Sequence, residues 1–203
     1  MTDQRMTIKA ETVKQLRELT GAGFMDCKRA LEESEGDMER AALRLRERGL
    51  VAAQSKASRE AREGQVASYI HPGGRVGVLI EVNCETDFVA RTDEFQKLVH
   101  DLAMQVAGLA PLYVTVESIP AETVEAKRQE LLEDDVVQGK PEGVRGQIVE
   151  GQLRKWYSQV VLLEQPFRDT ELTVGQLVTN AIATMGENIR VRRFTRYALA
   201  EEL

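Results

Sequence analysis

Cysteine and histidine are scarce in this 203-residue sequence, and their scarcity excludes several kinds of site. The two cysteines, Cys27 and Cys84, make no disulfide framework and fit a reducing compartment. With only His71 and His100 in addition, no cluster has the spacing of zinc ligands. We therefore expect no metal bound to the chain.

Long hydrophobic runs are also missing. No stretch of about 18 consecutive apolar residues occurs, so the sequence predicts no membrane span. The opening residues, MTDQRMTIKAETV, lack the apolar segment behind a basic one that marks a secretory signal. We expect a cytoplasmic protein, and a processed organelle form is left open.

Aromatic residues make up only 5% of the chain, whereas 42% of its residues are hydrophobic and 30% are charged, which predicts a folded protein with an aliphatic core. The net charge is −6, with 13 basic against 12 acidic residues in 1–63 and 14 against 21 in 64–203. A nucleic-acid binder needs a concentrated basic face. The one dense late cluster lies on a predicted strand that alternates faces, so we expect no direct nucleic-acid contact; it comprises Arg190, Arg192, Arg193 and Arg196.

Residues 1–50 predict a small domain of three helices. The first is capped by Thr12 and stops at Gly21, the second spans 24–34, and the third is capped by Asp37 and stops at Gly49. Such a bundle has a thin core and is typical of docking modules rather than of enzymes. Residues 51–63, rich in alanine, serine and charge, predict a linker that can be partly helical.

Residues 64–203 predict an α+β core domain. It opens with a hairpin, because the strand-like runs GQVASYIH and RVGVLIEVN are separated by Pro-Gly-Gly. An amphipathic helix over 93–108, a short strand LYVTV and helices after Pro120, Pro141 and Thr173 follow, and ENIRVRRFTRYAL predicts a last strand. Without βαβ alternation, these elements predict an antiparallel sheet covered on one face by helices.

The helices between residues 120 and 165 predict a helical hairpin. Apolar residues there repeat every 3.5 residues over two heptads, at Val149, Leu153, Trp156, Val160 and Leu163. This stripe fits either packing inside the hairpin or a contact with another chain.

Two sequence patterns bear on whether the chain binds nucleotide or acts as an enzyme. TGAGFMDCK resembles a phosphate loop, but Asp26 stands where the loop requires glycine, and the preceding segment predicts a helix rather than a strand. Cys84 and His71 lie on the two hairpin strands and could approach each other, yet no third member orients them. A small buried side chain is the stronger interpretation of Cys84.

The stretch VNCETDFVAR, residues 82–91, raises the sharpest question about function. It places Phe88 between Asp87 and Val89 just after a predicted strand, where exposure to water is expected. Phe88 can be a core residue with Thr86 or Asp87 capping the turn, or it can be an exposed contact. The stretch alone favours the core.

Three motifs in order tie both domains to a known family: VKQLRELTGAGFMDCKRAL, VGVLIEVNCETDFVAR, and TVGQLV followed by MGENIRVRRF. Together they closely resemble bacterial-type translation elongation factor Ts, the nucleotide exchange factor for elongation factor Tu. The resemblance implies a ubiquitin-associated-like (UBA-like) N-terminal domain and an α+β core. Long members carry two core subdomains in tandem, whereas this chain has room for one, so the resemblance implies a homodimer.

The resemblance also implies which residues bind the partner. Phe88 is expected to be a wedge near the partner's Mg²⁺ and phosphate site, with Asp87 beside it and Thr86 and Val89 in support. Phe24, Met25 and Lys28 match the N-terminal docking surface, Met185 and Gly186 match a core contact, and His71 matches a contact that a second subunit would supply. Met25 and Met185 as core residues, and Lys28 as a solvated one, are the alternatives.

The expected activity is therefore release of GDP from elongation factor Tu, with no bond chemistry and no cofactor of the chain's own. Two other functions stay open at this point: an adaptor that docks through its N-terminal bundle, and a small enzyme built on Cys84 and His71.

Overall fold

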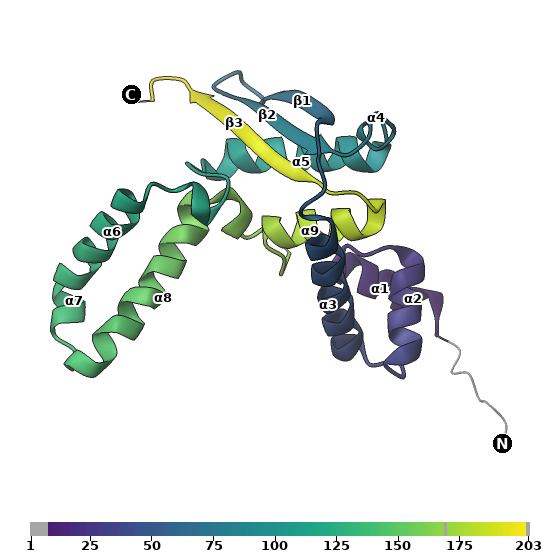
Figure 1. Ribbon diagram of the computed structural model, residues 1–203, viewed down its shortest axis with the longest axis horizontal. Helices are drawn as coiled ribbons and strands as arrows, with labels where there is room; N and C mark the ends of the chain where they lie inside the picture. The colour runs from purple at the N-terminus through teal and green to yellow at the C-terminus, as the bar shows by residue number, and fades with distance from the viewer. Residues whose placement is uncertain (1–7, 169, 202–203) are drawn as a thin grey trace.

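Apolar residues at helical spacing build a bundle at the N-terminus of the computed structural model, which describes residues 8–168 and 170–201 (Figure 1). Its helices are α1 (Ala10–Thr20), α2 (Phe24–Glu33) and α3 (Met38–Lys56). The three helices expected here are present, and the likeness of this bundle to a UBA domain stays a prediction. The three helices enclose a small core of Val13, Leu16, Cys27, Ala30, Leu31, Ala41 and Leu45.

Two helix boundaries in this bundle differ from the sequence prediction. Thr12 does not cap α1, which begins at Ala10 after an extended Lys9. Gly49 does not end α3, which continues to Lys56 and leaves only residues 57–62 as a connection. Gly49 lacks the left-handed φ of a helix-ending glycine, so α3 continues through it and packs against the crossing helix, where a Cβ at Gly49 would make an ordinary 3.5 Å contact with Thr179 Cγ2.

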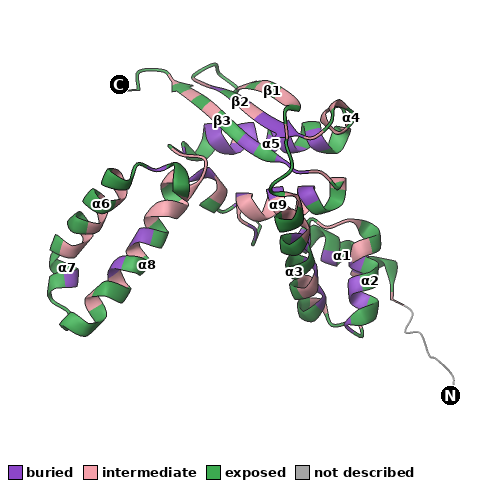
Figure 2. Ribbon diagram, in the orientation of Figure 1, coloured by how far each residue is buried: buried purple, intermediate pink, exposed green. Residues whose placement is uncertain are grey.

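The second domain is built on three antiparallel strands in the order β1-β2-β3. These are β1 (Glu63–Ile70), β2 (Val76–Cys84) and β3 (Arg190–Ala198), with α4 (Asp87–Ala90) directly after β2. Alternate residues of β2, namely Val78, Ile80, Val82 and Cys84, point to one face and are buried. Helix α5 (Asp93–Leu109) covers that face, and α9 (Val174–Met185) packs beneath it (Figure 2). The α+β prediction is confirmed.

A helical arm extends from the core on the side away from the bundle (Figure 1). It consists of α6 (Ala121–Glu133), α7 (Asp135–Gln138) and α8 (Glu142–Val160), framed by the short 3-10 helices η1 (Val116–Ser118) and η2 (Leu162–Glu164). Val149 and Leu153 of the predicted stripe are buried against Val137 within the arm. Val149 and Leu153, the first part of the stripe, therefore pack inside the hairpin and are not available for contact with another chain.

The segment LYVTV does not form the expected strand. Tyr113 makes a single parallel bridge to Val161, and the N–H groups of Leu112 and Tyr113 both donate to the carbonyl of Val160. The segment is thus tied to the end of α8, where no strand edge is present for it to extend.

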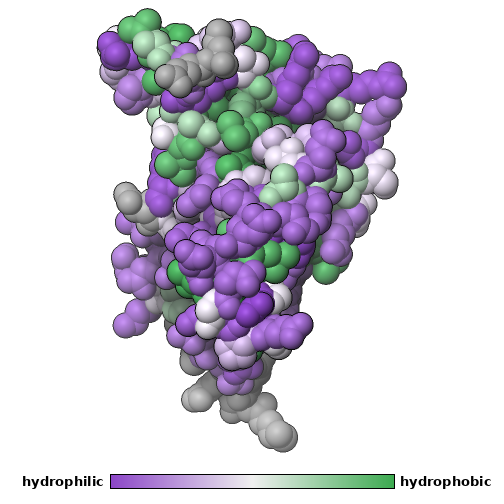
Figure 3. Space-filling view, turned by 90° about the vertical axis from the view of Figure 1, so that its left-hand side faces the viewer, coloured by the Kyte–Doolittle hydropathy of each residue, from purple (hydrophilic) through white to green (hydrophobic). Residues whose placement is uncertain are grey.

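Seen from the arm's side, the surface is mainly hydrophilic, and hydrophobic side chains gather in its upper half (Figure 3).

Candidate partner-binding site

Phe88 is the most unusual side chain on the surface, because 79% of it is exposed. It lies on α4, a single helical turn in which none of the four residues is buried. Burying a phenylalanine stabilises a fold, so an exposed one outside the core is available for another molecule. The core interpretation of Phe88 is therefore wrong.

The turn that carries Phe88 is capped locally. Thr86 is extended, and its hydroxyl accepts the N–H of Val89 at 3.4 Å, which satisfies one of the free donors at the start of α4. Asp87, in the first turn, forms an ion pair with Arg91 at 2.8 Å. Val89 packs partly against the main core and anchors the turn from below.

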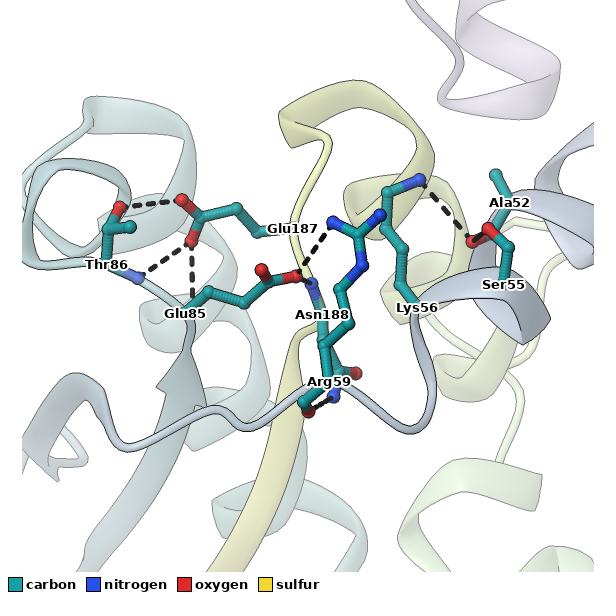
Figure 4. Close-up of polar contacts among 8 residues, drawn as sticks. All are labelled: Ala52, Ser55, Lys56, Arg59, Glu85, Thr86, Glu187 and Asn188. Carbon is teal, nitrogen blue, oxygen red and sulfur yellow. Dashed lines mark hydrogen bonds and ion pairs between the residues drawn. The ribbon is translucent and has the colours of Figure 1, made fainter.

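A carboxylate from a distant segment joins this turn (Figure 4). Glu187 Oε2 accepts the backbone N–H groups of Glu85 and Thr86, each at 3.0 Å, and Glu187 Oε1 accepts the Thr86 hydroxyl at 2.6 Å. In return Glu85 Oε1 accepts the N–H of Asn188 at 2.6 Å. The motif before α4 and the motif after α9 are thereby held side by side.

The α9–β3 turn therefore lies next to the turn that carries Phe88. Met185, the last residue of α9, is half-buried and packs partly on the main core, while the exposed Gly186 ends the helix with a left-handed φ of 77°. The structure places these two residues near Thr86, because Glu187 follows them directly and hydrogen-bonds to Thr86. Met185 also fits its alternative as the last core position of its helix.

The N-terminal residues are exposed on the first turns of α2. Phe24 is 46% and Met25 67% exposed, so Met25 is not a core residue. Lys28, also exposed, is 3.9 Å from Glu32 in a surface ion pair that contributes little to stability. Gly23 precedes the helix in extended conformation and presents both apolar side chains at its start.

The bundle is fixed to the core close to this region. Helix α3 packs against α9, and Asn180 of α9 donates its side-chain N–H to the carbonyl of Thr20. The connection after α3 is tied as well, since Asn188 Nδ2 donates to the carbonyl of Arg59 at 2.7 Å. The two sets of exposed apolar side chains, on α2 and on α4, thus belong to domains that are in direct contact.

His71 does not join this site within one chain. It lies exposed beyond β1 at the turn end of the hairpin, where its Nδ1 is 3.1 Å from the Tyr69 hydroxyl. Phe88 follows the opposite end of the nine-residue β2, and this end lies roughly 25 Å from the turn end at the usual rise per residue. The same register corrects a second expectation: Cys84 pairs with Glu63, at the far end from His71, so the two cannot approach each other.

Cys84 is also unsuited to nucleophilic chemistry. It is fully buried, and its Sγ donates to the carbonyl of Thr86 at 3.1 Å. Burial, with a smaller contribution from the nearby Glu187 carboxylate, raises the pKa of this thiol to about 11. A thiol with such a pKa carries almost no thiolate near neutral pH.

The late arginine cluster is largely occupied by acids. Arg192 and Arg193 both reach Glu81, at 3.0 and 2.7 Å, because a β-bulge between Glu81 and Val82 breaks the strict alternation expected for β3. Arg196 pairs with Glu201 at 2.7 Å.

Metal sites and membrane-spanning helices are both absent from the described part of the chain. Within residues 8–168 and 170–201, no group of three or more histidine, cysteine or acidic side chains is arranged to hold a metal. Over the same residues, every helix is too short or too polar to cross a bilayer.

Sequence reasoning missed two residues of this region, Glu85 and Glu187. Both stand inside the quoted motifs, but an acid next to a predicted turn gives no sign of its partner. Only the contact between segments about a hundred residues apart reveals them.

Comparison with known proteins gives one consistent result. A family model described as "Elongation factor TS" matches residues 7–181. "Elongation factor Ts" of Heliobacterium modesticaldum is 53% identical over 97% of this chain and 92% of its own length. "Elongation factor Ts" of Coprothermobacter proteolyticus is 52% identical over 97% of this chain and all of its own length, and that of a Synechococcus strain is 54% identical over 97% and 77%.

Proposed function

The chain belongs to the elongation factor Ts family of translation elongation factors, and from this premise we propose that it is the guanine-nucleotide exchange factor for elongation factor Tu. The observation that carries the proposal is the exposure of Phe88 on a capped turn outside the core. An adaptor that docks only through its bundle has no need of such a side chain.

The mechanism is a coupling of two binding equilibria. Phe88 enters an apolar crevice of the partner that opens only when the Mg²⁺ and phosphate site is distorted, with Asp87 as the polar residue beside it. Burial of one phenylalanine is worth about 1.5–3 kcal/mol, which is available only in that distorted state. Because coupling is reciprocal, weakening of GDP by this protein equals weakening of this protein by GDP. Incoming GTP then displaces it, and the chain itself performs no bond chemistry.

A second contact steadies the complex. Phe24 and Met25, with Lys28 at the rim, form an exposed apolar surface on α2 that docks on the partner's nucleotide-binding domain. Met185 and Gly186 contact the partner next to the wedge. The packing of α3 on α9 supports a docking surface and a wedge that act together.

We assign the homodimer to the uncovered face of the sheet. Helix α5 covers one face, whereas the other exposes Val66, Ile70, Leu79 and Tyr197. The register places Leu79 between Ser68 and Thr195, and Ile70 next to Gly77, so these side chains share one surface. The chain carries one core where long family members carry two, and a two-fold contact of identical faces joins two cores. His71, at the edge of this sheet, would then act on the partner bound by the other subunit.

The proposal is tested by stopped-flow release of a fluorescent GDP analogue from elongation factor Tu. Intact protein accelerates release, and Phe88→Ala loses most of that acceleration while melting at nearly the same temperature, since Phe88 packs on nothing buried. Phe95→Ala is the matched control: Phe95 is fully buried, so this change costs about 3–5 kcal/mol of folding stability. If the intact protein leaves GDP release unchanged, the exchange function is wrong, and an adaptor is the function to test next.

A further inference from the structure

The helical turn that carries Phe88 cannot hold its own conformation. Helix α4 has four residues, and the first turn of a helix forms at a net cost because it fixes several dihedral angles for one hydrogen bond. Two of its backbone bonds are long, with the N–H groups of Ala90 and Arg91 each 3.3 Å from their acceptors. Something outside the turn has to set its geometry.

Glu187 supplies that support from the other end of the chain. Its two carboxylate oxygens accept three donors, two from the backbone and one from the Thr86 hydroxyl (Figure 4). The same hydroxyl accepts the N–H of Val89, so one chain of hydrogen bonds runs from Glu187 through Thr86 into α4. Bonds to an ionised carboxylate are stronger than neutral ones.

The support is reciprocal and reaches the interdomain connection. Glu85 Oε1 accepts the N–H of Asn188, the residue next to Glu187, and lies 3.6 Å from the guanidinium of Arg59. Asn188 in turn donates to the carbonyl of Arg59. We refer to Glu85, Thr86, Glu187 and Asn188 as the carboxylate clamp. It fastens the start of α4, the end of α9 and the 57–62 connection to one another.

We propose that Glu187 is a positioning residue for nucleotide exchange, which acts through Thr86 to hold Phe88 in the orientation that enters the partner. This inference rests on the proposed exchange function. A rigid wedge delivers its burial energy without first paying the entropy of ordering the turn. A carboxylate is required because three donors converge on it, and a glutamine there would offer one acceptor oxygen and a competing NH₂ group.

Rates of GDP release test the proposal with a double-mutant cycle. Glu187→Ala lowers the acceleration of GDP release about tenfold, as expected when a charge-assisted hydrogen bond that orders the wedge is lost. Glu187→Gln falls between Glu187→Ala and the intact protein. In a Phe88→Ala background, Glu187→Ala changes the rate less than about twofold, because no wedge remains to be positioned. Glu122→Ala, an exposed glutamate in the first turn of α6, is the matched control and leaves the rate unchanged.

Additive losses in the double mutant overturn the proposal, since Glu187 would then act on the partner or on the fold independently of Phe88. Unchanged exchange in Glu187→Ala also overturns it. A second measurement separates failure of the positioning role of Glu187 from failure of the proposed exchange function. In the free protein, amide hydrogen exchange at Val89 and Ala90 becomes at least severalfold faster in Glu187→Ala than in Glu122→Ala. That result supports the clamp even if the intact protein does not accelerate GDP release from elongation factor Tu. Equal rates of amide hydrogen exchange in the two variants overturn the proposal.

Discussion

Two phenylalanines seven positions apart have opposite roles in this protein. Phe88 is 79% exposed on α4, whereas Phe95 is fully buried on α5. Phe95 faces the sheet because α5 lies across β1 and β2, whereas Phe88 precedes that helix on α4, a turn that packs Val89 against the core and leaves Phe88 outside it. The apolar spacing of α5 predicts the burial of Phe95, but the direction of Phe88 depends on how its turn is anchored.

The buried thiol of Cys84 predicts a pH dependence of stability. Its pKa is raised to about 11 in the folded state by burial, whereas an unfolded cysteine titrates near its ordinary value of 9.0. Between these values the unfolded chain loses a proton that the folded chain keeps, so the free energy of unfolding falls as pH rises. Below pH 9 this contribution is fully present.

Denaturant unfolding at pH 7.5 and 10.5 measures the effect, with Cys84→Ser as the reference that cannot titrate there. We expect the intact protein to lose more stability than the serine variant over this interval, by on the order of 1–2 kcal/mol. Burial also raises the pKa of Cys27, but that thiol is present in both proteins and cancels in the comparison. Equal losses in both proteins would show that Cys84 ionises as readily in the folded state.

At the scale of elements, the arm contains a helix weakened by its own sequence. Helix α8 carries Gly143, Gly146 and Gly151 on exposed positions, and a Cβ added at any of them would meet nothing within 4 Å. Glycine in a helix interior costs about 0.5–1 kcal/mol relative to alanine. Packing of Val149 and Leu153 against Val137 compensates for this loss.

Gly151→Ala therefore stabilises α8, by about 0.5–1 kcal/mol. Hydrogen exchange of the α8 amides, read residue by residue, is the appropriate measurement because the arm has its own small core. Gly175→Ala in α9 is the contrasting control, since its Cβ would lie 3.0 Å from the carbonyl oxygen of Leu163 and destabilise the packing. Slower exchange in α9 of the Gly175 variant, or faster exchange in α8 of the Gly151 variant, would contradict this account.

At the scale of the whole molecule, the sheet has one helix-covered face and one open face. The open face presents apolar side chains at alternate strand positions, with Leu79 53% exposed at its centre. Its acidic residue, Glu81, is neutralised by Arg192 and Arg193, and the hydrogen bond from Arg193 lowers the pKa of that carboxyl. An exposed apolar surface of this kind is typical of an interface.

Leu79→Lys is expected to convert a dimer into a monomer. Two lysines would face each other across the two-fold contact, and a like-charge pair in an apolar interface is strongly unfavourable. Sedimentation velocity at micromolar concentration detects the change in mass. Val144→Lys, at an exposed position of α8 outside the apolar stripe, is the matched control, and it leaves the dimer intact if the sheet face forms the contact. A monomeric intact protein would contradict the assignment of a homodimer.

The elements themselves were largely determined by the sequence. The caps at Asp37 and Thr173, the Pro-Gly-Gly turn and the apolar spacing of α5 all act through neighbours within one helical turn or one hairpin. Such local signals give the correct element whatever lies around it. The motifs likewise gave the family and the two exposed groups expected to bind the partner, whose role remains a proposal.

Only the tertiary structure decided what depends on distant segments. Gly49 ends no helix because α3 continues through it to pack against α9, LYVTV forms no strand because it is held by α8, and Cys84 and His71 are separated by the hairpin register. The carboxylate clamp joins Thr86 to Glu187, and neither residue signals the other along the chain. The sequence determines elements through local hydrogen bonds and periodicity, whereas the contacts that tie the turn carrying Phe88 to Glu187 join segments about a hundred residues apart, which only the tertiary fold brings together.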